Sequence, residues 1–129
     1  MIAIDTNVLV RYVVGDDPVQ SAQAARFLED ALTPESPGFV SLIVVVELSW
    51  VLARAYRASG ETVRDVLRRL LESRQIVVQS ADVVERALTP AEGDLADALI
   101  HHLGVAAGCD RTVTFDRRFA RMAGVERLR

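Results

Sequence analysis

The chain has 129 residues, of which 50% are hydrophobic and 26% charged, and its formal net charge is −3. This length and apolar content predict one folded domain over residues 1–129 and argue against a disordered chain. No apolar run approaches the ~20 residues of a membrane-spanning helix, and a single cysteine excludes an internal disulfide. The first five residues lack the basic segment that opens a signal peptide, so we expect a cytoplasmic protein with no membrane partner.

The first forty residues alternate strand-like and helix-like segments. Residues 1–4 are predicted to form a buried strand, and Asp5-Thr6-Asn7 offers N-cap chemistry for a short helix over residues 8–14. Residues 19–32 have helical spacing, and a second strand is predicted at residues 39–41. The candidate core residues of the helix at 19–32 are Ala22, Ala25, Phe27, Leu28 and Leu32.

Residues 42–58 fit two kinds of element. The β-branched run from Ile43 to Val46 favours a strand locally, whereas the length of the segment and its continued apolar spacing favour a helix. We predict a helix.

Helices and strands continue to alternate in the second half. We predict helices at residues 61–73, 81–88, 94–106 and 117–122, strands at 76–78 and 112–115, a turn at 89–93, and an edge strand at 125–128. This alternation predicts an α/β domain whose central, mainly parallel sheet is flanked by helices. Sites in such folds form beyond the carboxyl ends of the strands, and Asp5 and Asp116 each directly follow a predicted strand.

Four acids stand at or near the start of predicted helices. Asp5 and Asp116 each have a simple structural explanation as an N-cap, and Asp94 is the expected N-cap of the helix at 94–106. Asp97 lies in the first turn of that helix, where the helix dipole favours a carboxylate by ~0.3–1 kcal/mol. Taken singly, each of these acids can be structural.

Glu47 has no such simple explanation. Its neighbours three and four positions away on a helix are all apolar, which predicts a carboxylate within a core-facing stripe. An unpaired charge there costs several kcal/mol, so the group must be neutral, ion-paired or bound to a metal. A buried ion pair with an arginine is the main alternative to a metal. The neighbours are Ile43, Val44, Trp50 and Val51.

A metal would give these acids a shared purpose. Hydrolysis of a phosphodiester brings a nucleophile to an anion and must stabilise an alkoxide leaving group, and two divalent cations about 3.5–4 Å apart serve both needs. Carboxylates are hard oxygen ligands that select Mg²⁺ or Mn²⁺. The candidate metal ligands are Asp5, Glu47, Asp97 and Asp116.

The sequence resembles PIN-domain ribonucleases, most closely the compact VapC toxins of bacterial toxin–antitoxin pairs. Four short motifs carry the resemblance, in the family's order and across nearly the whole chain. They are Asp5-Thr6-Asn7-Val8-Leu9, Val46-Glu47-Leu48, Asp94-Leu95-Ala96-Asp97-Ala98-Leu99-Ile100 and Thr114-Phe115-Asp116. The resemblance implies a PIN-like three-layer domain in which the four acids bind metal directly or through water.

The resemblance also implies substrates and partners. Such proteins cut single-stranded regions of structured RNA, often tRNA or rRNA, usually form homodimers, and are silenced by a small VapB-like antitoxin. Asn7 and Thr114 correspond to supporting polar residues that orient the ligands. Asp94 matches an accessory acid found in part of the family, so it is either an outer-sphere ligand or only an N-cap.

Other readings stay open. His101 has the spacing from Asp97 of a zinc chelate, although a supporting or plain surface role is the simpler interpretation. All 15 basic residues are arginine, which suits phosphate binding but can equally reflect codon usage. Arg64, Arg68 and Arg69 form a helix surface that either faces RNA or is merely solvated.

Three rival functions remain. An aspartyl phosphatase normally carries a second acid two positions after the first, where this chain has Asn7. A DNA-directed or structure-specific nuclease would use the same carboxylates as a ribonuclease. A non-catalytic binding module would keep the fold and act only through its partner.

Overall fold

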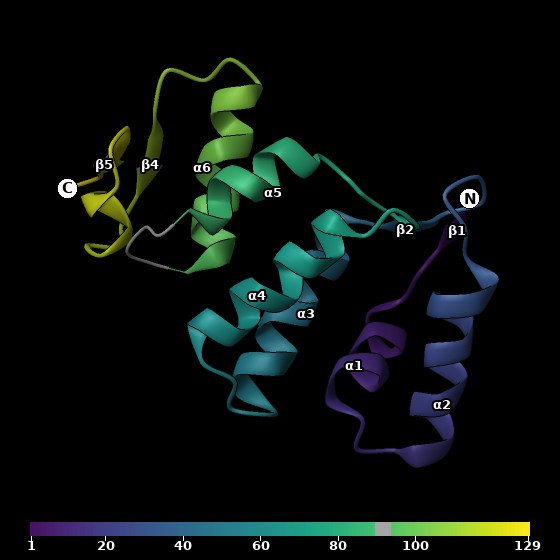
Figure 1. Ribbon diagram of the computed structural model, residues 1–129. Helices are drawn as coiled ribbons and strands as arrows, with labels where there is room; N and C mark the ends of the chain where they lie inside the picture. Colours follow the sequence, from purple (N-terminus) through teal and green to yellow (C-terminus); the bar gives the residue numbers. More distant parts are fainter. Residues whose placement is uncertain (90–93) are drawn as a thin grey trace. The chain divides into compact units, whose positions relative to one another are not determined.

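The computed structural model describes residues 1–89 and 94–129. The backbone forms two compact units, an N-terminal unit, Met1–Ala81, and a C-terminal unit, Asp82–Arg129 (Figure 1). Every helix that the structure describes is too short or too polar to cross a membrane.

A three-stranded parallel sheet organises the N-terminal unit. Its strands are β1 (Ile2–Ala3), β2 (Gly38–Val40) and β3 (Ile76–Val78), in the order β1-β2-β3. Gly38 pairs with Ile2 on one side and with Ile76 on the other. A Cβ at Gly38 would collide with the Ile4 side chain and lie 2.9 Å from Leu32 Cδ1, so this position needs a glycine for the core to pack against the central strand.

The helices of the N-terminal unit follow its strands. They are α1 (Thr6–Val14), α2 (Pro18–Arg26), α3 (Leu42–Arg54) and α4 (Gly60–Glu72), and a π-helical turn, η1 (Phe27–Ala31), continues α2. Asp5, Asp17, Ser41 and Ser59 cap the four helices, each side chain accepting a hydrogen bond from a backbone N–H. Figure 1 shows α1 beside α2 and α3 beside α4.

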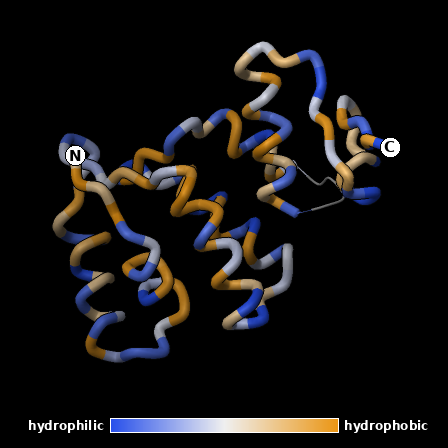
Figure 2. Tube along the Cα trace, turned by 180° about the vertical axis from the view of Figure 1, so that it is seen from behind, coloured by the Kyte–Doolittle hydropathy of each residue, from blue (hydrophilic) through white to orange (hydrophobic). Residues whose placement is uncertain are grey.

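The core of the N-terminal unit is made by β2, parts of the other strands and one face of each helix. The burial predicted for the first strand is wrong, because Ile2 and Ala3 of β1 are exposed and only Ile4, which follows them, is buried. The least exposed side chains of the core include Leu9, Val40, Val45, Leu48 and Leu67. Full burial of one such side chain stabilises the fold by about 1.5–3 kcal/mol. Figure 2 shows the matching pattern along the chain, where hydrophobic and hydrophilic residues alternate within the helices.

The C-terminal unit combines two helices with a separate pair of strands. These elements are α5 (Ala81–Leu88), α6 (Leu95–Ala106), β4 (Thr112–Thr114), the 3-10 turn η2 (Phe119–Arg121) and β5 (Val125–Arg127). β4 and β5 pair in parallel, with Thr112 opposite Val125. Val84, Leu88 and Leu99 are buried here, so the C-terminal unit has apolar packing of its own.

The predicted order of elements is confirmed, and so is the α/β class with parallel strands. Three predicted helices differ in extent. The segment at 19–32 leaves α-helical geometry after Arg26, the helix at 42–58 ends at Arg54, and the helix at 117–122 is a single 3-10 turn. In the segment at 19–32, Leu28 and Leu32 are buried as expected, but Ala24 is buried in place of Ala22. Apart from Thr89, the predicted turn at 89–93 lies outside the described residues.

Candidate functional site

Asp5 lies between β1 and α1 and is exposed. Its Oδ1 accepts a hydrogen bond of 2.7 Å from the backbone N–H of Thr6, so the expected N-cap role is real. With Asn7 it borders an open hollow of about 720 Å³ on the N-terminal unit, which Arg11 also lines. The carboxylate is therefore fixed by the backbone and still faces open space.

Thr6 links Asp5 to Glu47. Its backbone N–H binds Asp5, and its hydroxyl donates a hydrogen bond of 3.0 Å to Oε1 of Glu47. The side chain of Thr6 is 7% exposed, so both bonds start from a fixed position in the core. The structure thus brings the first two predicted acids together through a residue that the sequence reasoning treated only as part of a cap. The sequence does contain one indication of this role, because Thr6 is a polar residue between the candidate site residues Asp5 and Asn7.

The burial predicted for Glu47 is wrong. The side chain is exposed, and its recorded partner is the Thr6 hydroxyl rather than an arginine. On the same face of α3, Ile43 is 72% exposed and Trp50 is 41% exposed, with the Arg54 guanidinium 5.3 Å from the Trp50 ring centroid. The buried face of α3 carries other residues, namely Val44, Val45, Leu48, Ser49 and Leu52. Because α3 is apolar on nearly all sides, its spacing alone did not identify the buried face.

The C-terminal unit brings three acids near one another. Asp94 caps α6, its Oδ1 accepting from the backbone N–H of Ala96 at 2.8 Å, and Asp97 lies half-buried one turn further. Burial raises the pKa of the Asp97 carboxyl above its usual range, and the negative charges of Asp94 and then Asp116 raise it further. The described residues thus disfavour the ionised form of Asp97, and a nearby cation would stabilise it.

Asp116 is held on both sides by hydrogen bonds. Its Oδ1 accepts from the backbone N–H groups of Arg118 at 2.7 Å and Phe119 at 3.1 Å, which starts η2. Its own N–H donates to the hydroxyl of Thr114 at 3.0 Å. Thr114 therefore orients the segment that carries Asp116, as expected of a supporting residue, while Asn7 is exposed on α1.

His101 has a structural role. The ring is 7% exposed, its Nδ1 lies 2.9 Å from the hydroxyl of Thr112, and a Cβ at Gly124 would lie 2.9 Å from its Cε1. The plain surface role allowed from the sequence is wrong, because the ring is buried and packs against Thr112 of β4 and against Gly124, which precedes β5. Its contacts tie α6 to β4, the strand that leads to Asp116.

The candidate ligands have the right chemistry for a hard cation. All are carboxylates, and oxygen donors fit Mg²⁺ or Mn²⁺ better than softer metals. One set, Asp5 and Glu47, is joined through Thr6, and the other holds Asp97 and Asp116. In residues 1–89 and 94–129 no group of three or more carboxylate, histidine or cysteine side chains is placed to hold a metal ion. A site that draws on both sets therefore stays a prediction.

The fold and these acids define a class of α/β protein in which two carboxylates follow parallel strands, Asp5 after β1 and Asp116 after β4, and two lie on helices. The family model of the PIN domain matches residues 2–125, so the chain belongs to the PIN domain family. The predicted PIN domain family and its α/β architecture are thereby confirmed, membership supports a nuclease-type fold, and the resemblance to VapC toxins stays a prediction. A comparison with curated proteins gives no match.

Proposed function

We propose that this protein is a metal-dependent endoribonuclease that acts as the toxin of a toxin–antitoxin pair. The observation that carries the proposal is the PIN domain match over residues 2–125, because that span includes all four candidate ligands and PIN domains are generally metal-dependent nucleases. The local geometry supports it, since hydrogen bonds fix three of the four acids, namely Asp5, Glu47 and Asp116.

The four acids share one task in this proposal. Asp5, Glu47, Asp97 and Asp116 would hold Mg²⁺ or Mn²⁺, which supplies Lewis acidity at the scissile phosphate when bound. Thr6 orients the first two acids through its N–H and hydroxyl. Burial and the like charges of Asp94 and Asp116 raise the pKa of Asp97, and a bound cation would oppose that shift.

RNA as the substrate and the toxin role rest on the resemblance of the four motifs to VapC toxins. By that resemblance we propose cleavage in single-stranded regions of tRNA or rRNA, which places the activity in the cytoplasm. We also propose a homodimer and a small VapB-like antitoxin as the inhibitor. Brief induction in living cells followed by mapping of new RNA ends tests activity and substrate class together, and an unchanged RNA profile would contradict the toxin role.

Cleavage by purified, inhibitor-free protein tests the enzyme. Structured RNA and single-stranded DNA are incubated with Mg²⁺ or Mn²⁺ and then with EDTA. We expect metal-dependent cutting of RNA that Asp5→Asn, Glu47→Gln and Asp97→Asn each abolish, while Asp110→Asn, an exposed acid outside the proposed site, keeps it. No cutting by the wild type would favour a non-catalytic binding module, and preferential cutting of DNA would favour a DNA nuclease.

Metal binding can be measured without turnover. A ligand present at 100 times its Kd stabilises a folded protein by about 2.7 kcal/mol, so Mn²⁺ should raise the Tm of the wild type. We expect Asp5→Asn and Asp97→Asn to remove that rise, although the two residues belong to different units. If only Asp97→Asn removed it, the cation would be held without the N-terminal acids, and the four-acid site would be wrong.

A further inference from the structure

The end of the chain is strongly basic although the whole protein is acidic. Residues 111–129 contain six arginines and two acids, whereas the formal charge of the entire chain is −3. A local excess of positive charge attracts anions even where the net charge is negative. The excess belongs to a segment that begins with β4 and contains Asp116, one of the candidate metal ligands.

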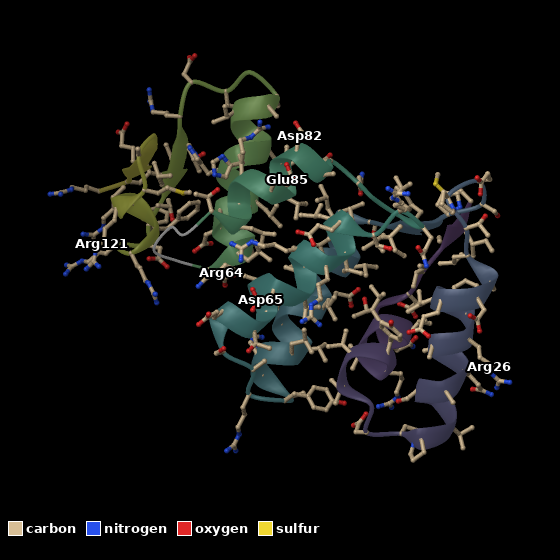
Figure 3. The ribbon with its side chains drawn as sticks, in the orientation of Figure 1. Arg26, Arg64, Asp65, Asp82, Glu85 and Arg121 are labelled. Atoms are coloured by element: carbon tan, nitrogen blue, oxygen red, sulfur yellow. The ribbon has the colours of Figure 1, made fainter. Side chains whose placement is uncertain are left out.

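Four of these six arginines border a common hollow. It has a volume of about 840 Å³ and lies entirely on the C-terminal unit. Its lining includes four arginines, Arg117, Arg121, Arg127 and Arg129, with a single acid among the remaining residues. Figure 3 shows Arg121 extending from η2 with other nitrogen-tipped side chains of the same segment around it.

Two observations concern how the single acid of this lining and one of its arginines, Arg127, are paired. The acid in the lining, Glu126, forms an ion pair of 3.2 Å with Arg111, which does not line the hollow. Nε of Arg127 is buried and has no hydrogen-bond partner among residues 1–89 and 94–129. A buried donor without an acceptor costs about 1–3 kcal/mol, so the guanidinium of Arg127 is not fully satisfied by the described residues.

We propose that this hollow, hereafter the arginine hollow, binds a backbone phosphate of the RNA substrate. The guanidinium group donates two parallel hydrogen bonds to phosphate oxygens, and four such groups around one hollow suit a polyanionic strand. The hollow is linked to one candidate catalytic acid, Asp116, by the chain itself. Asp116 accepts hydrogen bonds from the N–H groups of Arg118 and Phe119, which fixes the turn that carries Arg117 and Arg121.

This assignment rests on the proposed nuclease function and gives it a way to position substrate. Phosphate contacts fix the register of a strand without reading its sequence. A phosphate held in the arginine hollow would hold the strand beside Asp116, while the carboxylates bind the cation. Removal of the arginines should therefore weaken binding for every RNA sequence by a similar factor.

Binding to a fluorescein-labelled single-stranded RNA in EDTA tests the arginine hollow without turnover. The test variants are Arg117→Gln/Arg129→Gln, two exposed residues, and Arg127→Gln. The matched control is Arg26→Gln/Arg74→Gln, two exposed arginines of the N-terminal unit, and Figure 3 shows Arg26 extending from α2. Circular dichroism confirms that each variant is folded.

We expect the double variant of the arginine hollow to bind at least about 10-fold more weakly at low salt. Each lost phosphate contact lowers the slope of log K against log salt by about 0.7 for a single strand, so the double variant should lose about 1.4 of slope. Arg127→Gln should lose about 0.7, and the control should keep the wild-type slope. Equal losses in the control and the test variants, or no loss in either, would overturn the proposal.

Two further outcomes separate this proposal from the proposed function. If the wild type cuts RNA and the test variants bind RNA normally, phosphate binding by the arginine hollow is refuted and the proposed nuclease function is supported. If RNA binding depends on these arginines but no metal supports cutting, the proposed nuclease function is refuted and RNA binding by the arginine hollow is supported. Arginine-dependent binding to anionic lipid vesicles, with none to RNA, would overturn the assignment of the ligand.

Discussion

Gly124 is the position where the packing of His101 against β4, the strand that leads to Asp116, can be tested most directly. Its φ is +85°, and an added Cβ would lie 2.9 Å from Cε1 and 3.3 Å from Nε2 of His101. The His101 ring is buried and held by the Thr112 hydroxyl at 2.9 Å, so it cannot move aside without losing that bond. Gly124→Ala therefore combines backbone strain with a steric clash.

Both terms can be estimated from the structure. An L residue in the left-handed region costs about 1–2 kcal/mol, and overpacking of a filled core costs about 1–3 kcal/mol. We expect Gly124→Ala to lower the free energy of unfolding by about 3 kcal/mol. With an unfolding entropy of ~2.1 cal/mol/K per residue, that loss lowers Tm by about 10 °C in a chain of this length.

Gly108→Ala is the matched control, because Gly108 has φ +91° but nothing within 4 Å of an added Cβ. Thermal and urea unfolding should show a loss of about 1–2 kcal/mol for this control. In a His101→Ala background, Gly124→Ala should fall to the control value, since the clash is gone. If Gly124→Ala were no worse than Gly108→Ala with His101 present, the packing described for His101 would be refuted.

Three other substitutions probe the candidate ligands. Thr6→Val should lower kcat/KM about 10-fold because Glu47 loses its hydroxyl donor, whereas Thr6→Ser keeps that donor and most of the activity. Steady-state kinetics on RNA compares the two variants, and equal losses would contradict the role of Thr6 in orienting Glu47. Asp97→Asn should raise Tm in EDTA at pH 7, because the raised pKa means that stability falls as pH rises through it. The difference in Tm between Asp97→Asn and the wild type should shrink as pH falls toward the usual aspartate pKa of 3.8. Tm measured over a pH series tests this, and a difference that does not depend on pH would contradict it. Asp94→Ser keeps an N-cap but removes a charge, so the free energy of unfolding should not change. If Asp94 is an outer-sphere ligand, RNA cleavage should be about 10-fold slower. Unchanged cleavage would show that Asp94 acts only as an N-cap.

The element order could be predicted because its signals are local. The strands at β1 and β3 are short apolar runs, and the ends of α1 are fixed by Asp5 and Gly15, a cap and a left-handed glycine. The prediction of parallel strands follows from their alternation with helices. Such signals need no knowledge of distant contacts, which is why the α/β class was predicted correctly.

Contacts between distant segments were not available to sequence reasoning. Thr6 and Glu47 are 41 residues apart, and nothing in either segment alone predicts their hydrogen bond. His101 and Gly124 likewise meet only after β4 and β5 pair. The buried face of α3 was also misassigned, because a helix that is apolar on most sides does not reveal which side meets the core.

The structure changes which acid points most strongly to function. From the sequence it was Glu47, on the assumption of burial, but this side chain is exposed and accepts a hydrogen bond from Thr6. Asp97 is the half-buried acid, and the charges of Asp94 and Asp116 oppose its ionisation. A purely structural residue in that place would be more favourable as an amide, so the carboxylate needs another reason to be there.

The roles of helix cap and metal ligand, which appear as alternatives in the sequence, do not exclude each other in the structure. The capping hydrogen bonds of Asp5, Asp94 and Asp116 all use Oδ1, and a carboxylate has a second oxygen and further lone pairs. A cap fixes the orientation of the group, which is what a metal ligand requires from its surroundings. The two roles are therefore compatible in one residue, and the cap explains how the fold holds the carboxylate rather than why it is present.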